Sequence, residues 1–180
     1  MQNCLGIYIE SNLIKYAKVS KDRDTFKVDA FGIRFFDNLN EAIKKIVEET
    51  YSFTTPISIN LANEQYLYYD IFALLSKNDI QKTVETEFET FCDENKYNQK
   101  AFETRYALVS NVQNKERIKA IQVIVNKIEL NKQKQYLEKH NLSGILPIGT
   151  AIANIAKFEK KENVLIVNME EKTTITTIYD

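Results

Sequence analysis

Strand-like runs alternate with one-sided helical stripes along most of this chain, and this alternation restricts the fold more than any other feature. Two strand-like runs at 4–10 and 13–20 are joined by the polar pair Ser11-Asn12, a spacing typical of a β-hairpin. A third run at 26–36 precedes an apolar stripe at helical spacing. The stripe consists of Leu39, Ala42, Ile43, Ile46 and Val47. The pattern predicts an α/β protein.

The rest of the chain continues the alternation. Further strands are expected at 57–62, 65–72, 102–109, 118–125 and 144–148, and helices at 78–91, near 127–140 and at 150–158. Residues 164–169 and 173–179 predict a final hairpin. This hairpin repeats the pattern of residues 4–20, which indicates a second copy of the same architecture that has just begun.

Composition excludes several classes of protein. Lys and Arg number 24 against 25 Asp and Glu, so the net charge of −1 gives no basic surface for general nucleic-acid binding. Two cysteines are too few for a disulfide scaffold, and His140 is the one histidine, which leaves little room for a histidine metal site or a Ser-His-Asp triad. No apolar run suits a signal peptide or a membrane-spanning helix. We therefore expect no metal ligand and no nucleic-acid partner.

The two hairpin segments carry a family resemblance. GIYIESNLIK at 6–15 resembles the first phosphate loop of the actin-like ATPases, which in the PilM and FtsA branch reads Gly-Ile-Asp-Ile-Gly-Ser-Ser-Ser-Ile-Lys. LIVNMEEKTTIT at 165–176 resembles the second phosphate loop, Asp-Ile-Gly-x-x-x-Thr, with Thr173 and Thr174 on the threonine positions. The order of strands and helices between them is similar to that of PilM, a type IV pilus assembly family. The resemblance implies an α/β, actin-like (ribonuclease H-like) mixed-sheet domain with a small inserted α+β subdomain.

The same resemblance implies a division of the chain. Residues 1–55 and 114–158 would form the large actin-like subdomain, and 56–113 the inserted small subdomain, of the 1C type. Residues 159–180 would be the opening hairpin of a second actin-like half, which is otherwise absent. A truncated chain and a naturally short one are both open.

Both phosphate loops depart from the family pattern at the same two positions. Tyr8 and Asn168 stand in place of Asp, and Glu10 and Glu170 stand in place of Gly. In this fold the first acidic residue helps to hold the metal, and the glycines let backbone N–H groups reach the phosphates. Two like charges at ~4 Å near a protein surface repel by about 4 kcal/mol, so each glutamate would oppose a phosphate. We expect weak nucleotide binding or none.

The two loops contain the candidate contacts of a nucleotide site. If the degenerate loops still bind, their contacts would be Ser11, Asn12, Lys15, Thr173 and Thr174, with ATP and magnesium as the cofactors. Otherwise we expect no cofactor, and in either case no catalytic residue is assigned. An ordinary structural reading also exists for each of them. Lys15 suits a solvated sheet edge, Ser11 and Asn12 a plain turn, and the threonines a half-buried strand.

The segment QYLYYDIF at 65–72 carries bulky side chains on both faces. Alternation places Tyr66, Tyr68, Asp70 and Phe72 on one face and the intervening residues on the other. One face should meet the helix at 78–91. The other is either buried within the subdomain or forms a peptide groove with aromatic anchors. PilM-like proteins receive the cytoplasmic tail of the membrane-anchored protein PilN in a groove between their large and small subdomains. The resemblance therefore implies a partner site here, with Tyr66, Tyr68 and Phe72 as candidate contacts.

Two functions follow from these observations. The first is a non-catalytic scaffold of a type IV pilus or related secretion assembly, cytoplasmic and peripheral at the inner face of the cell membrane, which binds a PilN-like tail. Self-association is also open. The second is an FtsA-type ATPase that binds and hydrolyses ATP. A small α/β interaction domain with a coincidental likeness is the third reading. Tyr8, Glu10, Asn168 and Glu170 favour the first.

Overall fold

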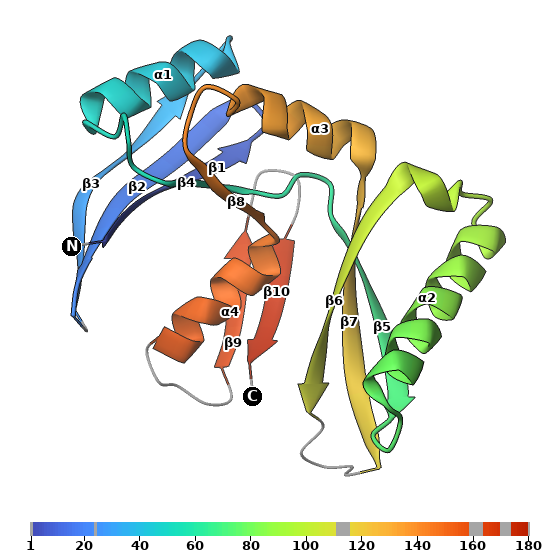
Figure 1. Ribbon diagram of the computed structural model, residues 1–180. Coiled ribbons are helices and arrows are strands. Elements are labelled where there is room, and N and C mark those ends of the chain that lie inside the picture. Colours follow the sequence, from blue (N-terminus) through green and yellow to red (C-terminus); the bar gives the residue numbers. More distant parts are fainter. Residues whose placement is uncertain (1, 24, 111–115, 159–163, 170–173, 180) are drawn as a thin grey trace. The chain divides into compact units, whose positions relative to one another are not determined.

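The computed structural model describes residues 2–23, 25–110, 116–158, 164–169 and 174–179 (Figure 1). The chain divides into two compact units. The first unit comprises Met1–Leu61 and Lys134–Asp180, and the inserted unit comprises Ala62–Gln133. Helix α3 (Lys127–Tyr136) contains one of the two points at which the chain passes between them.

A five-stranded mixed sheet, with strand order β3-β2-β1-β4-β8, forms the first unit. Its strands are β1 (Gln2–Glu10), β2 (Leu13–Asp22), β3 (Thr25–Phe35), β4 (Ile57–Asn60) and β8 (Leu142–Leu146). β1, β2 and β3 pair antiparallel, whereas β4 is parallel to both β1 and β8. Glu10 pairs with Leu13, so Ser11 and Asn12 form the two-residue turn of the predicted hairpin.

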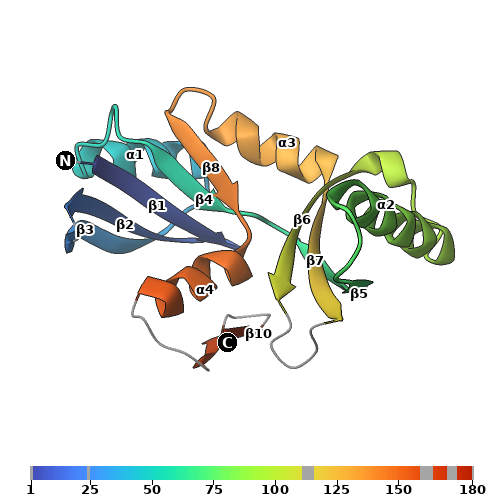
Figure 2. The same ribbon diagram turned by 60° about the horizontal axis from the view of Figure 1, so that its bottom comes forward.

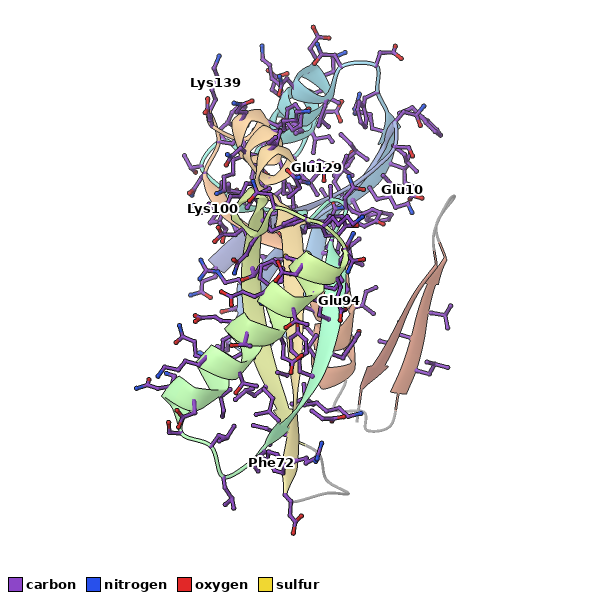
Figure 3. All side chains as sticks on the ribbon, turned by 90° about the vertical axis from the view of Figure 1, so that its right-hand side faces the viewer. Glu10, Phe72, Glu94, Lys100, Glu129 and Lys139 are labelled. Atoms are coloured by element: carbon purple, nitrogen blue, oxygen red, sulfur yellow. The ribbon has the colours of Figure 1, made fainter. Side chains whose placement is uncertain are left out.

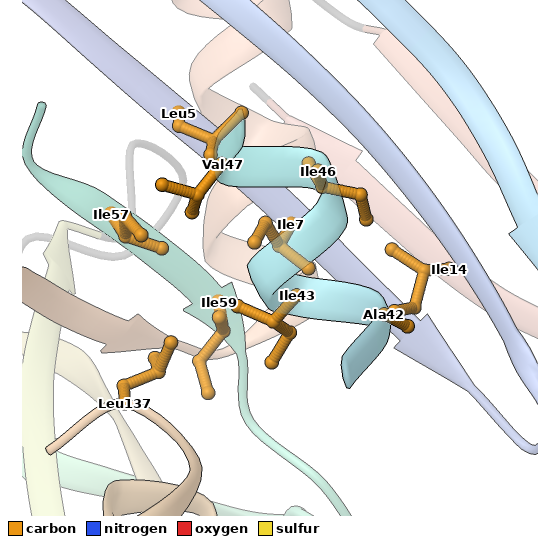
Figure 4. Packing of buried hydrophobic residues seen from close by; sticks show 10 residues of the cluster. All are labelled: Leu5, Ile7, Ile14, Ala42, Ile43, Ile46, Val47, Ile57, Ile59 and Leu137. Atoms are coloured by element: carbon orange, nitrogen blue, oxygen red, sulfur yellow. The ribbon is translucent and has the colours of Figure 1, made fainter. Parts of the chain in front are cut away.

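Helices α1 (Leu39–Glu49) and α4 (Ile148–Phe158) lie on opposite faces of this sheet (Figure 2). Asn38 caps α1, because its side-chain oxygen accepts a hydrogen bond from the Glu41 backbone N–H at 3.2 Å. The predicted apolar stripe of α1 packs against alternate residues of β1 and β4 (Figure 4). The fully buried members of this core include Leu5, Ile14, Ile43, Ile46 and Ile57. Each such side chain stabilises the fold by about 1.5–3 kcal/mol through burial.

The last two strands of the first unit form the hairpin that the sequence predicts from residues 164–169 and 173–179. β9 (Val164–Met169) and β10 (Thr174–Tyr179) pair antiparallel as a separate two-stranded sheet. α4 contacts both strands of this hairpin.

The inserted unit is a three-stranded antiparallel sheet with one helix on it. β5 (Gln65–Phe72), β7 (Arg117–Asn126) and β6 (Phe102–Ser110) lie in the order β5-β7-β6. Helix α2 (Lys77–Glu94), followed by the 3₁₀ turn Gln99–Ala101, covers one face. Its buried residues are Ile80, Val84, Phe88 and Cys92. Ser76 caps α2 by accepting a hydrogen bond from the Asp79 backbone N–H at 3.3 Å.

Two strands lie in a different unit from the one expected. The resemblance places residues 57–60 in the inserted subdomain (56–113), but β4 pairs with β1 and β8 in the first unit. It places residues 118–125 in the large subdomain (114–158), but β7 is the central strand of the inserted unit. Apolar alternation shows which residues share a face, but it does not show which sheet a strand joins. The bounds at 56 and 114 therefore differ from those of the structure.

Truncation of a core residue should test the packing of α1. Ile46 is fully buried, so Ile46→Ala should lower the free energy of unfolding by about 2–5 kcal/mol, through lost burial and the cavity left behind. Lys45→Ala, on the exposed side of the same helix, should change it by less than about 0.5 kcal/mol. Urea unfolding followed by circular dichroism measures both. Equal losses in the two variants would contradict this packing.

Tyr69 should make the stability of the inserted unit depend on alkaline pH. Its hydroxyl donates a hydrogen bond to Gln122 Oε1 at 2.8 Å. Burial, with smaller contributions from Glu87 and Cys92, raises the pKa of Tyr69 to about 12. In the unfolded chain tyrosine titrates near 10, so the folded state holds this proton more tightly. The associated stability is present below pH ~10 and is lost as the pH rises toward 12.

The Tyr69→Phe variant isolates this effect. It should unfold at lower urea concentration at neutral pH, because Gln122 is only 2% exposed and loses a hydrogen bond, at a cost of about 1–3 kcal/mol. It should also lose less stability than the wild type between pH 9.5 and 11.5. Identical pH slopes for the two proteins would show that Tyr69 titrates normally.

Candidate functional site

The β1–β2 hairpin, which resembles a first phosphate loop, brings three ionisable side chains together. Tyr8 and Lys15 are directly opposite in the antiparallel register. Lys15 Nζ lies 5.3 Å from the centre of the Tyr8 ring and 3.2 Å from Glu10 Oε2. The Glu10 side chain is 12% exposed and that of Lys15 is 44% exposed. The cation that would meet a phosphate is therefore already paired with the residue that replaces the loop glycine.

The turn of this hairpin holds the other two candidate contacts. Ser11 and Asn12 are both exposed, and Ser11 takes a positive φ of 50°. Such a φ is uncommon for a residue with a side chain. The Asn12 carbonyl accepts a hydrogen bond from the Phe36 backbone N–H at 2.9 Å, which ties the turn to the end of β3. The structure thus places Ser11, Asn12 and Lys15 on one hairpin.

The second candidate loop is described only in part. Thr174 is the first residue of β10 and pairs with Met169 of β9. Thr173 and Glu170 lie outside the described residues, as do the side chains of Thr174 and Asn168. The contribution of this loop to a site stays a prediction.

A pocket of about 470 Å³ opens beside the first hairpin, within the first unit. Residues of β1, β2, β4, β8 and α4 line it. They are Gly6, Ile7, Tyr8, Lys15, Tyr16, Ala17, Ser58, Ile59, Asn60, Leu146, Ile148, Ala151 and Ile152. Of the predicted phosphate-loop contacts, only Lys15 is among them. The walls from β4, β8 and α4 carry no local sequence signal, so sequence reasoning missed them.

The polar side chains of the pocket are engaged in the sheet. Asn60 Oδ1 accepts a hydrogen bond from the Ile9 backbone N–H at 2.7 Å, and Asn60 Nδ2 donates to the Ile9 carbonyl at 3.0 Å. This side-chain amide extends the β1–β4 ladder by one step. Ser58 Oγ lies 3.8 Å from Cys4 Sγ. The pocket therefore presents mainly apolar atoms to a ligand.

The second candidate surface is the sheet face of the inserted unit opposite α2. Tyr68 is 66% exposed and Phe72 is 58% exposed, whereas Ile71 between them is buried against α2. Phe72 is the last residue of β5 (Figure 3). The predicted alternation along β5 is thus present in the structure. Tyr66 is half-buried, and its hydroxyl donates a hydrogen bond to Glu64 Oε1 at 2.6 Å.

Neighbouring strands extend this surface. Tyr68 is opposite Ile121 of β7, which in turn is opposite Ala107 of β6. The Phe72 ring lies 4.8 Å from the guanidinium carbon of Arg117. We call the side chains that share this face of the three strands, centred on Tyr68 and Phe72, the open face of the inserted unit. It combines aromatic and aliphatic side chains with basic ones.

Other reactive groups in the part of the chain that the structure describes do not form a site. Burial, with a contribution from Asp93, raises the pKa of the Cys92 thiol, which keeps it protonated and unreactive near neutral pH. Among the described residues, no three His, Cys, Asp or Glu side chains are grouped so as to hold a metal ion. None of the helices in the described ranges combines the length and hydrophobicity needed to cross a bilayer.

Comparison with solved structures identifies the fold. No family model and no curated protein gives a significant match to the sequence. A chain of the "PilM-PilN type IV pilus biogenesis complex" matches with a TM-score of 0.76 at 12% identity, over 97% of this chain and 57% of that one. The cytoplasmic domain of EpsL, an inner membrane component of the type II secretion system of Vibrio cholerae, matches with a TM-score of 0.57 at 17% identity, over 83% of this chain and 59% of that one.

A third match is more distant. A Bacteroides thetaiotaomicron protein with an actin-like ATPase fold and unknown function gives a TM-score of 0.47 at 11% identity, over 99% of this chain and 66% of that one. The two nearer matches concern the fold alone, because their identities are low. They confirm the predicted PilM-like α/β fold. The chain spans less than two thirds of the length of either solved chain.

Proposed function

We propose that this chain is a non-catalytic binding module of a type IV pilus or related secretion assembly, and that it binds the cytoplasmic tail of a membrane-anchored, PilN-like partner. The observation that carries the proposal is the open face of the inserted unit, where Tyr68 and Phe72 are more than half exposed. The fold likeness to a chain of the PilM-PilN complex supports the assembly context. Such a module acts in the cytoplasm, at the inner face of the cell membrane.

The chemistry of the open face indicates what the tail must offer. Exposed aromatic rings provide anchors for apolar side chains, since aromatic residues contribute most to binding at small interfaces. Three basic side chains share this face with Tyr68 by register, namely Arg105, Arg117 and Lys119. Two acidic ones share it as well, since Asp70 is directly opposite Lys119 and Glu103 Oε1 lies 3.6 Å from the Arg105 guanidinium. The one basic side chain in excess favours a tail whose apolar residues are accompanied by an acidic one.

Removal of the Tyr68 ring should weaken capture of the tail. Tyr68→Ala should raise the dissociation constant for the cytoplasmic tail of a PilN-like protein from the same genome by about tenfold or more, because an anchoring ring is lost. Its thermal unfolding should stay close to that of the wild type, since the side chain is 66% exposed. Calorimetric titration with a synthetic tail peptide and a circular dichroism melt measure the two effects.

A second exposed tyrosine supplies the matched control. Tyr51 is 82% exposed and belongs to the first unit, so Tyr51→Ala should leave the affinity unchanged. A parallel loss of folding and binding in Tyr68→Ala would show that the ring is structural. Equal weakening in both variants would exclude the open face as the specific site.

The Lys15–Glu10 ion pair disfavours the alternative function, an ATPase. A nucleotide phosphate at Lys15 would approach the Glu10 carboxylate, which lies 3.2 Å from the ammonium nitrogen. Tyr8 stands where the fold family has an aspartate that helps to hold the metal. The proposed module accordingly needs no cofactor, whereas ATP and magnesium belong to the alternative.

Calorimetric titration with magnesium and ATP distinguishes the two functions. The wild type should show no binding at micromolar ATP. Glu10→Gln should raise the weak affinity for ATP by about two- to fivefold, because it removes the competing negative charge at a partly buried ion pair. Glu48→Gln, on the exposed side of α1, is the matched control and should have no effect. Micromolar binding by the wild type would favour the ATPase.

A further inference from the structure

The pocket of the first unit has a shape and lining that suit a ligand other than a nucleotide. Leu5 and Ile7 point into the core beneath α1, so Gly6 between them faces the pocket. Gly6 brings no side chain, and the neighbouring wall residue Ala17 brings only a methyl group. Leu146, Ile148 and Ile152 supply aliphatic atoms from β8 and α4. The volume of about 470 Å³ lies within the range of small-molecule sites.

The charge balance of the pocket disfavours a polyanion. Lys15 is the one lining residue in the described structure that carries a full charge at neutral pH, and it is paired with Glu10. The side-chain amide of Asn60 is already hydrogen-bonded to the β1 backbone. A ligand with several charges would therefore lose hydration without gaining matching partners, whereas an apolar body would gain by leaving water.

We propose that this pocket binds a small, uncharged and mainly apolar organic molecule, of about the size of two linked aromatic rings. In this proposal the apolar molecule lies over Gly6 and Ala17, and the aliphatic side chains of β8 and α4 contact its other side. This site belongs entirely to the first unit, and the proposed tail surface belongs to the inserted unit. The two proposals therefore stand or fail separately.

A neutral fluorescent probe tests the site on the whole chain. N-phenyl-1-naphthylamine has two linked aromatic systems and becomes brighter in an apolar environment. Gly6→Val should reduce its affinity at least tenfold, because the new side chain occupies the pocket. A Cβ at Gly6 has its nearest neighbour, the Ala17 carbonyl oxygen, at 3.7 Å, which is an ordinary contact, so the variant should fold. Valine also favours a strand more than glycine does.

Lys45→Leu is the control. Lys45 is exposed on α1, which lies on the opposite face of the sheet from α4, and it does not line the pocket. This variant should bind the probe within twofold of the wild type. Should Gly6→Val fail to fold by circular dichroism, Ala151→Leu narrows the same pocket from α4 and should reduce probe affinity.

Two results would overturn the proposal. The pocket face of the sheet continues to β3, where Phe31 is 80% exposed, so a probe could bind there instead. Wild-type probe affinity in a folded Gly6→Val protein, with loss in Phe31→Ser, would place the probe on β3. Displacement of the probe by micromolar ATP in the presence of magnesium would show that the pocket is a nucleotide site. Loss in Gly6→Val alone, with no displacement by ATP, is the expected result.

Discussion

The parallel pairing of β4 with β1 is the constraint on which the first unit depends. It places Leu5 beside Ile57 and Ile7 beside Ile59, and these four side chains form the floor on which α1 packs. Because side chains alternate between the faces of a sheet, the same register sends Gly6 and Ser58 to the opposite face. One ladder thus creates both the core and the pocket. A slip of one residue would exchange the two faces.

The side chains around Lys15 set the charge pattern of the pocket face. Ser11 and Asn12 form a two-residue turn, and Lys15 is directly opposite Tyr8 in the register that follows from it. Tyr8 supplies a ring beside that lysine, and Glu10 supplies a carboxylate. The backbone of the fold constrains where a ligand lies, and these side chains decide its chemistry.

In the inserted unit, too, side chains alternate between the two faces of the sheet. α2 covers one face of the sheet β5-β7-β6, and Ile71 and the half-buried Tyr69 pack in the cluster formed with it. The other face keeps Tyr68 and Phe72 in contact with solvent. In the proposed function, these two exposed rings would bind a peptide at little entropic cost, because aromatic side chains lose few rotations on binding.

The sequence by itself determined the local features: both hairpins, the caps at Asn38 and Ser76, the stripe of α1 and the two faces of β5. Each depends on residues within a few positions of one another, where periodicity and capping act. Only the tertiary structure decided that β4 joins the first sheet and β7 the inserted one, and that Ser58, Asn60 and Ile148 share a pocket with Lys15. Apart from the β6–β7 pairing, those contacts join segments 40 or more residues apart, and the hydrophobic period specifies a buried face without specifying its partner.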